Sequence, residues 1–517
     1  MLNSWLTLLP PAFVILGAII TQRIHPALFI GILSASAIAT GAHIWPTLQL
    51  TGHSLYATAT DIDNIYLYAF LIAIGTLVSL FATTGAATSF ALAVTQKIRS
   101  ARQVQYSSLF VSCLLFIDDY LSILTTGYVM SPLTDRFKIA RQKLAFLVHS
   151  MAGPIVILAP VSSWVATIIG YLDQVGVNTE LGQTTRVAAD PFYIYLKTIP
   201  FIFYSFLVIA SVWYIIQADI SYGPMHEYDE HAKQAPLAPL PKETPAHTSN
   251  LLFPLTVLVV GIIIGLPLAG GYWLFGGSYG LIESLKYNEH PFLVMLIAAV
   301  LAVLVGFARC YQRNLITFRQ LPSILCNGFN LMIGAITMVY LASTFSGILA
   351  NHVGTGQYLA TLFIGSVPLW LLPTMFFLVS LICTIATGSA WGNFALMIPI
   401  AVPMITSLSG LMLPIDPQAL PLLLPTLGAI FSGSVCGDHI SPLSETTIMA
   451  AASTCIRPLV HSYTQLPYAL PAVIGSTIAF MLAGITTASL KPLWVLLISL
   501  GSGILSCLCL IWWWNKK

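Results

Sequence analysis

The sequence contains little charge. Asp, Glu, Lys and Arg together make up only 7% of its 517 residues, whereas hydrophobic residues make up 57%. Because a soluble domain carries about 25% charged residues, this composition excludes a soluble protein and predicts a polytopic membrane protein surrounded by lipid. The formal net charge is only +2, and the basic residues do not gather with aromatics in one patch, so we expect no nucleic-acid partner.

Other signatures are also missing. The eight cysteines include no CxxC pair and lie mostly in apolar runs, which is typical of packing thiols. The chain has neither a nucleophile–base constellation nor a phosphate-binding loop, so we expect no enzyme activity and no cofactor. The N-terminus lacks the positive region and cleavage site of a signal peptide, and Pro10 interrupts its apolar run, which favours a retained first span.

What the sequence does contain is one charged stretch between long apolar runs. Residues 432–453 read SGSVCGDHISPLSETTIMAAAS and include Asp438, His439 and Glu445. An ionised carboxylate in hydrocarbon costs several kcal/mol unless it is paired or hydrated, so acids at membrane depth mark ion or substrate sites. The alternative is an extramembrane loop joining two short spans, which the limited length of the apolar flanks disfavours.

The same stretch is predicted to break its own helix. Pro442 removes a backbone donor, and we expect Gly433 and Gly437 to loosen the helix on its N-terminal side. Broken backbone at membrane depth is tolerated only where protein or a water-filled cavity surrounds it. A charged, broken span therefore predicts a transport site.

Three motifs resemble those of the NhaC-type sodium/proton antiporter family over roughly positions 60–480. They are GDHISPLSETT in the central stretch, FIDDY at 116–120 and GSAWGNFALMIPIA at 388–401. The resemblance implies exchange of Na+ for H+ in a prokaryotic cytoplasmic membrane, on an ion-transporter fold with paired hairpins. Relatives of the family are linked to organic solutes, so a sodium- or proton-coupled transporter of an amino acid or organic acid is the alternative.

Apolar runs and basic loops predict how the chain crosses the membrane. A span needs about 20 apolar residues, and short loops rich in Lys and Arg stay cytoplasmic. These rules predict an all-α protein with about 11 transmembrane helices and two re-entrant hairpins, its N-terminus outside and its C-terminus cytoplasmic. The predicted spans are 5–22, 26–48, 64–83, 143–170, 192–217, 250–275, 290–311, 322–350, 420–453, 467–487 and 491–514.

Residues 104–132 form the first predicted hairpin. Basic loops flank this run on both sides, so a single crossing would leave one basic cluster outside. A hairpin that enters and leaves on one side keeps both clusters cytoplasmic and places Asp118 and Asp119 near its tip. A second hairpin is predicted at 370–404, with its tip at 387–393.

The chain also divides into two repeats of opposite hand. Each contains a span, an arm (84–95 or 353–365), a hairpin and a broken span, and the loop before the first repeat is acidic whereas the loop before the second is basic. In transporters built from inverted repeats with discontinuous helices, the binding site lies at the membrane midplane. Such proteins transport by alternating access. The predicted organisation is N-terminal spans 1–63, first repeat 64–217, cytoplasmic linker 218–249, connecting spans 250–321, second repeat 322–487 and C-terminal span 488–517.

Buried acids are the candidates for the exchange chemistry. Sodium prefers hard oxygen ligands, and a proton competes for the same carboxylate, so we expect Asp118 and Asp438 to bind Na+. An i, i+4 spacing would put Ser441 and Glu445 on one helix face, as it would Asp118 and Ser122. The complete predicted ion or substrate site is Asp118, Asp119, Ser122, Ser162, Ser163, Ser389, Asn393, Asp438, His439, Ser441, Ser444 and Glu445.

Some roles stay open at this point. His439 either relays protons or orients Asp438 through a hydrogen bond, and Trp164 and Trp391 either line a cavity or pack. A transition-metal site made of Cys436, Asp438 and His439 is disfavoured, because the adjacent residues 438 and 439 point apart on a helix. The spans show no arginine suited to clamp a carboxylate substrate, which favours ions as the only cargo. A homodimer is an open alternative to a monomer.

Overall fold

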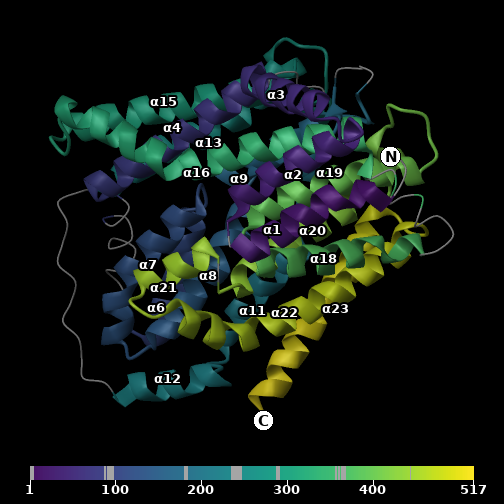
Figure 1. The fold of residues 1–517 in the computed structure, drawn as a ribbon. Helices are drawn as coiled ribbons and strands as arrows, with labels where there is room; N and C mark the ends of the chain where they lie inside the picture. The colour runs from purple at the N-terminus through teal and green to yellow at the C-terminus, as the bar shows by residue number, and fades with distance from the viewer. Residues whose placement is uncertain are drawn as a thin grey trace.

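The protein, seen here in a computed structural model, is built almost entirely of helices (Figure 1). The structure describes residues 5–21, 23–86, 89, 98–179, 184–234, 247–286, 291–355, 358, 361, 368–442 and 444–516. The first elements are η1 (Trp5–Leu8), α1 (Leu9–Thr21), α2 (Ile24–Ala39), α3 (Ile44–Thr60), α4 (Ile62–Thr84), α6 (Ala101–Leu114), α7 (Asp119–Arg136), α8 (Arg141–Leu158), α9 (Ser163–Gln174), α10 (Pro191–Thr198), η2 (Ile199–Phe201), α11 (Phe203–Gln217) and α12 (Pro224–Gln234).

The remaining helices form the second half of the molecule. They are α13 (Ser249–Ala269), η3 (Trp273–Phe275), α14 (Leu281–Lys286), α15 (Pro291–Gln312), η4 (Phe318–Gln320), α16 (Leu321–Ile348), η5 (Leu349–Val353), η6 (Leu369–Leu371), α18 (Leu372–Thr387), α19 (Ala390–Leu408), η7 (Pro417–Ala419), α20 (Leu423–Ile440), α21 (Glu445–Ser453), α22 (Pro458–Thr487) and α23 (Pro492–Asn515). The short strands β1 (Val177–Asn178) and β2 (Val187–Ala188) pair in parallel. The predicted all-α class is confirmed.

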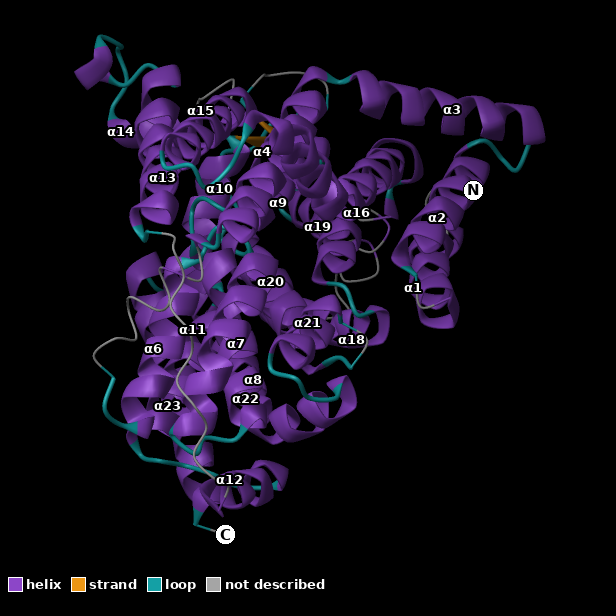
Figure 2. Ribbon diagram, turned by 90° about the vertical axis from the view of Figure 1, so that its left-hand side faces the viewer, coloured by secondary structure: helices purple, strands orange, loops and turns teal. Residues whose placement is uncertain are grey.

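The helices are suited to a membrane. In the described part of the chain, eight are long and apolar enough to cross one, and the number reaches ten if each of two bent pairs counts as one span. The helices α4, α13, α15 and α16 pack together at one end, whereas α12 and the C-terminus lie at the opposite end (Figures 1 and 2). The predicted polytopic membrane class with broken helices is confirmed.

Both predicted hairpins are helix–break–helix units. Helices α6 and α7 are separated by a short break that ends at Asp118, and Ser122 of α7 donates back to the Ser112 carbonyl of α6 at 3.3 Å. Helices α18 and α19 meet at Gly388, whose φ of 69° suits glycine, and Ser389 caps α19 through Gly392. By length and composition, each arm of this second hairpin could cross a membrane.

Breaks recur in the same order in the two halves. After the first hairpin, α8 and α9, which make up the predicted broken span 143–170, are bent by 47° around residues 159–162. After the second hairpin, α20 and α21 are interrupted between Ile440 and Glu445. This order agrees with two related halves, although the predicted domain boundaries stay predictions. Most of the arms 84–95 and 353–365, the linker residues 235–246 and Leu443 lie outside the described residues.

Two predicted spans were wrong in part. The span 26–48 ends at Ala39, and Gly41 and Ala42 take positive φ angles that turn the chain into α3, which lies across the direction of α2 (Figure 2). The span 192–217 is bent by 44° between α10–η2 and α11. Pro200 lies at this bend, where its missing N–H and its ring interrupt regular helix.

The predicted loosening by glycine was also wrong. Helix α20 is continuous through Gly433 and Gly437, which instead let it approach α18. An added Cβ at Gly433 would lie 2.5 Å from the Phe377 carbonyl oxygen, and at Gly437 it would lie 2.5 Å from Thr384 Cβ. Small residues that allow close backbone approach are a common means of packing membrane helices. The helix is interrupted only after Ile440.

The predicted cytoplasmic linker contains a helix of its own. Helix α12 is held to α8 by an ion pair between Lys143 Nζ and Asp229 Oδ2 at 3.2 Å, and both side chains are buried. Ser221 donates a further hydrogen bond to the same carboxylate oxygen at 2.6 Å. Because a buried charge is costly without a partner, this pair fixes α12 against the end of the bundle.

Candidate transport site

The break between α20 and α21 holds the carboxyl group of Asp438. Ser444 donates its hydroxyl to Asp438 Oδ1 at 2.5 Å, and Thr446 donates to Oδ2 at 2.6 Å. The two hydroxyl oxygens themselves lie 2.7 Å apart, which closes a ring of polar contacts. All three side chains are buried. The break matters because it leaves the chain free to bring two hydroxyls back onto an acid at the end of the preceding helix.

A second pair of acids lies at the break of the first hairpin. Asp118 accepts a hydrogen bond from Ser163 at 3.1 Å, and Asp119 accepts one from the indole N–H of Trp164 at 3.1 Å. Asp119 is fully buried, and its Oδ2 has no hydrogen-bond partner among the described residues. The start of α9 therefore supplies donors to both acids.

Direct contacts link the two breaks. The hydroxyl of Tyr120, next to the acid pair, donates to Glu445 Oε2 at 2.6 Å. Asp119 and Asp438 also lie close enough to interact electrostatically. Helices α7 and α21 pack against each other along this line. Tyr120 and Glu445 are 325 positions apart in the sequence. The fold thus brings two distant segments together into one polar region.

A cavity of about 380 Å³ adjoins this polar region. Aromatic side chains wall it, including Trp164 and Trp391, whose ring centroids lie 5.6 Å apart. The full lining is His25, Tyr120, Trp164, Asn330, Leu331, Ile333, Gly334, Gly388, Ser389, Ala390, Trp391, Asp438, Glu445, Thr446 and Met449. The two alternatives left open for the tryptophans both hold, since the rings line the cavity and also pack against each other, and Trp164 packs on Phe394 as well. Three of the predicted site residues, Ser389, Asp438 and Glu445, thus face one space that is large enough for hydrated ions or a small solute.

The predicted residues of the second hairpin have two different surroundings. Ser389 lines the cavity, whereas Asn393 is buried and donates to Ser434 Oγ of α20 at 2.7 Å. Its amide oxygen, Asn393 Oδ1, lacks a hydrogen-bond partner within the described chain. Ser434 in turn donates to the Ile430 carbonyl, so this contact ties α19 to α20.

Three predicted hydroxyls serve the backbone. Ser162 caps α9 by accepting from the Val165 N–H at 3.3 Å, and Ser122 points to α6 as described above. Ser441 donates to the Ile385 carbonyl of α18 at 2.8 Å. Because Ser441 lies in the break and not in a helix, the shared helix face predicted for Ser441 and Glu445 does not form.

His439 does not orient Asp438. Its Nε2 lies 3.0 Å from Ser150 Oγ and its Nδ1 lies 2.8 Å from the Tyr204 hydroxyl, so both ring nitrogens are occupied. Adjacent residues of a helix project in different directions, which separates the imidazole from the carboxylate. Of the two roles left open for His439, the hydrogen bond that would orient Asp438 is therefore absent.

Sequence reasoning missed several polar residues that the structure adds. Thr446, His149, His461 and Gln465 form a buried network beside Asp438. A signal was available, because a histidine inside an apolar run is costly and is seldom without function. The partners of these side chains could not be read from the sequence, since they come from three different helices.

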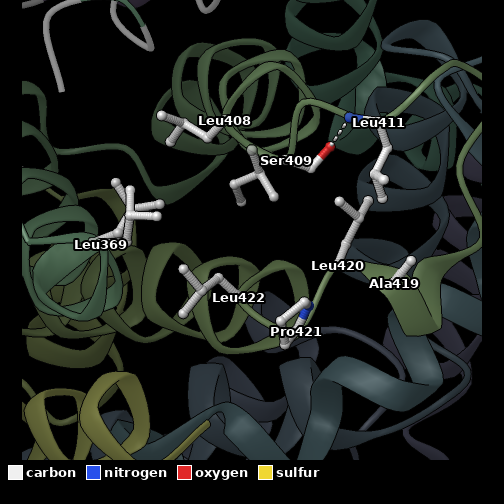
Figure 3. A pocket seen from close by; sticks show the side chains of 10 residues that line it. Leu369, Leu408, Ser409, Leu411, Ala419, Leu420, Pro421 and Leu422 are labelled. Atoms are coloured by element: carbon white, nitrogen blue, oxygen red, sulfur yellow. Dashed lines mark hydrogen bonds between the residues drawn. The ribbon is translucent and has the colours of Figure 1, made fainter. Parts of the chain in front are cut away.

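A second cavity, of about 210 Å³, lies where α19 ends and α20 begins (Figure 3). Leucines dominate its wall, and its one hydroxyl side chain, Ser409, accepts a hydrogen bond from the Leu411 N–H at 3.2 Å. None of the residues that line it in the described structure is titratable. This cavity therefore lacks the groups needed to exchange ions.

Comparison of sequences relates the chain to transporters. The sequence profile described as the Na+/H+ antiporter family matches residues 155–485. An uncharacterized protein of Haemophilus influenzae is 26% identical over 496 residues, which cover 94% of this chain and 92% of that protein. The malate-2H(+)/Na(+)-lactate antiporter of Bacillus subtilis is 26% identical over 234 residues, which cover 44% of this chain and 42% of that protein.

Comparison of structures agrees at the level of the fold. The YdaH transporter of Alcanivorax borkumensis superposes with a TM-score of 0.57 at 16% identity, over 86% of this chain and 89% of YdaH. The family match includes the Asp438 break and the second hairpin, and most of the chain aligns with a relative of similar length. The protein is thus a multi-pass membrane transporter, and its chain belongs to the Na+/H+ antiporter family.

Proposed function

We propose that the protein exchanges Na+ for H+ across the cytoplasmic membrane, by alternating access at a midplane site. The observation that carries this proposal is the buried carboxyl of Asp438, held at a helix break beside a cavity. A carboxyl group binds a proton or a cation but not both at full strength, because the proton removes the charge that attracts the cation. In this proposal the N-terminus lies outside and the C-terminus lies in the cytoplasm.

The hydrogen count around Asp438 supports a proton-loaded state. The carboxyl oxygens, Ser444 and Thr446 make three mutual contacts of 2.5, 2.6 and 2.7 Å. The two hydroxyls supply only two hydrogens, so all three contacts are satisfied only when the carboxyl carries the third. A protonated Asp438 completes the ring, and an ionised one leaves a contact between two oxygens without a hydrogen.

Loss of that proton prepares the same place for a cation. Two carboxylate oxygens of Asp438 and the hydroxyl oxygen of Ser444 are hard ligands of the kind that alkali and alkaline-earth ions prefer. Asp118 is proposed as a further Na+ ligand at the neighbouring break, with Ser163 beside it. Na+ is a cargo here and not a resident cofactor.

Removing the charge of Asp438 tests the proposal. Asp438→Asn keeps the size of the side chain, so purified variant in proteoliposomes is expected to show no proton movement in response to a Na+ gradient. Asp219→Asn is the matched control, because Asp219 is exposed and its φ of 51° suits asparagine equally well. Exchange at the wild-type rate in Asp438→Asn would refute the assignment of this residue.

A second candidate is a Na+-coupled or H+-coupled transporter of a small organic solute. The observation that favours it is the cavity volume of about 380 Å³, given aromatic walls by Trp164 and Trp391. Since a water molecule takes up about 30 Å³ of the liquid, this space corresponds to about 13 waters, enough for a small organic acid. Among the described lining residues there is no arginine or lysine to bind a carboxylate substrate, which supports ion exchange as the first choice.

Ion flux without added solute separates the two candidates. An antiporter of Na+ and H+ completes its cycle with the two cations alone, so vesicles without organic solute are expected to show full exchange. A solute carrier requires its partner, and the solute and Na+ would raise each other's affinity by the same factor. Na+ flux that appears only after an amino acid or organic acid is added would favour the second candidate.

A further inference from the structure

Three buried histidines meet beside the Asp438 break. His149 comes from α8, His439 from α20 and His461 from α22. The ring of His149 lies edge-on to His439 with centroids 4.7 Å apart, and its centroid is 5.1 Å from that of His461. Titratable side chains at membrane depth are expensive, so a cluster of them points to function.

An unbroken line of contacts joins this cluster to Asp438. Thr446 Oγ1 lies 2.6 Å from Asp438 Oδ2 and 3.0 Å from His149 Nε2. On the other side of the same ring, His149 Nδ1 lies 3.0 Å from His461 Nε2. Every separation is within hydrogen-bond range. The line ends at His461 Nδ1, which is buried and has no hydrogen-bond partner in the described part of the chain.

The donors along this line can be assigned from the hydrogens available. The Thr446 hydrogen lies within the ring at Asp438, so His149 must donate from Nε2 to the threonine oxygen. His149 Nδ1 is then an acceptor, and it faces His461 Nε2 at 3.0 Å and the Gln465 amide at 3.3 Å. Gln465 donates its second hydrogen to the His439 carbonyl at 2.6 Å, which fixes the amide in that orientation.

We propose that Thr446, His149 and His461 form a proton relay that serves Asp438. The proposal rests on the proposed exchange function and concerns only its proton limb. A proton binds His461 Nδ1, and the Nε2 proton of that ring passes to His149 Nδ1. The Nε2 proton of His149 passes to Thr446 Oγ1, and the hydroxyl proton passes to Asp438 Oδ2. Each group receives one proton and gives one up, and the reverse order unloads the carboxyl.

The relay leads toward the end of the bundle that carries α12. His461 lies in the first turn of α22, shortly after Cys455 and Ile456. These two residues border a cavity of about 540 Å³ between α12 and the α7–α8 turn, whose other lining residues include Asp135 and Arg141. This cavity, which borders the chain just before α22 and includes charged side chains, is where we place the entry and exit of protons from solvent.

His439 belongs to the cluster but not to the relay. Its ring bonds to Ser150 and Tyr204, and neither residue continues to Asp438. Among the described residues, two titratable groups face the relay: His439, which is near the rings of His149 and His461, and Asp438 itself. Tyr204 and Cys436 contact each other on the far side of His439. His439 therefore offers a matched control with the same chemistry and burial.

Two transport modes in the same proteoliposomes test the relay. Exchange of internal Na+ for external isotopic Na+ needs no proton transfer, whereas exchange of Na+ for H+ needs it in every cycle. For His149→Gln and His461→Gln we expect the Na+/H+ mode to fall about 100-fold or more, the size typical of a lost proton-transfer group. We expect the Na+/Na+ mode to persist, and His439→Gln to keep the wild-type ratio of the two modes.

Each outcome bears on a different claim. If the Na+/H+ rate and the Na+/Na+ rate change by the same factor from wild type in both His149→Gln and His461→Gln, the relay is overturned. The exchange function would be unaffected by that result. If glutamine at position 149 or 461 prevents folding, Thr446→Val and Thr446→Ser decide, because only serine keeps the hydroxyl. The relay is supported if Thr446→Val loses the Na+/H+ mode selectively and Thr446→Ser recovers it. The relay is overturned if the two variants have the same ratio of Na+/H+ to Na+/Na+ exchange. Wild-type protein without Na+-driven proton movement would overturn the exchange function and the relay together.

Discussion

Replacing Ser444 by alanine should shift the pH dependence of exchange. Ser444 Oγ lies 2.5 Å from Asp438 Oδ1 and donates a hydrogen bond to it, and in the ionised state that bond is made to a charged carboxylate. Hydrogen bonds to charged groups contribute about 1.5–3 kcal/mol, and those to neutral groups about 0.5–1.5 kcal/mol. Ser444→Ala removes the bond from both states of Asp438, but the ionised state loses about 1–2 kcal/mol more.

The sign and size of the shift follow from this difference. Because the ionised carboxylate is weakened more than the protonated carboxyl, the variant holds its proton to a higher pH. One pH unit corresponds to about 1.4 kcal/mol, so the acid limb of the activity profile should move up by about one pH unit. The apparent KM for Na+ should also rise on the alkaline side, where proton competition is absent, since Ser444 is a proposed ligand.

The assay is Na+-driven proton movement in proteoliposomes over a series of pH values at several Na+ concentrations. Ser211→Ala is the control, because Ser211 is buried in α11 but donates only to the Val208 carbonyl at 2.8 Å. It is expected to keep the wild-type midpoint. A midpoint that stays in place or moves to lower pH in Ser444→Ala would refute the role given to this hydroxyl.

Three further predictions concern the fold. Gly437→Ala should lower the free energy of unfolding by about 1–3 kcal/mol, since the added Cβ would lie 2.5 Å from a side-chain carbon of α18. Gly501→Ala is the control and should not destabilise the protein, because no atom lies within 4 Å of the added Cβ. Thermal unfolding in detergent measures both variants. Lys143→Met should cost about 3–5 kcal/mol by leaving Asp229 as a buried unpaired charge, and the double variant with Asp229→Leu should recover most of the loss. Single cysteines at Gln103 and Phe137, in a background without other exposed cysteines, should both react with an impermeant reagent from the same side, and labelling from opposite sides would contradict the re-entrant hairpin.

Much of the fold could be predicted because the membrane constrains the chain strongly. Apolar runs must be helices that satisfy their own backbone, so composition alone indicated a polytopic all-α protein. Helix breaks were located where proline or clustered polar residues interrupt such runs, and the structure has breaks before Asp119, at Gly388, before Ser163 and after Ile440. The family resemblance stated from the three motifs agrees with the family match over 155–485.

The errors have separate physical causes. The bend at Pro200 lies within a pair of helices that is long and apolar enough to count as one span, so an apolar count cannot separate the two. The end of α2 at Ala39 is set by the turn at Gly41 and Ala42, beyond which apolar residues continue into α3. The two glycines of α20 were expected to loosen the helix, but their effect depends on α18, which lies against them. For the two glycines, the intrinsic preference for a loosened helix was outweighed by the helix that packs beside them.

The sequence by itself determined that the protein lies in a membrane, that its spans are broken, and that Asp118, Asp119, Asp438 and Glu445 are the acids at the breaks. Each of these conclusions depends on local composition, because burying charge or interrupting a helix in hydrocarbon is costly wherever it occurs. Only the tertiary structure decided which groups those acids contact. His149 reaches Thr446 across 297 positions and His461 across 312, and no local pattern records such a pairing. Side-chain direction decides hydrogen bonding within about 3 Å, so His439, although adjacent to Asp438 in sequence, bonds elsewhere, while two distant histidines lie in line with the carboxyl.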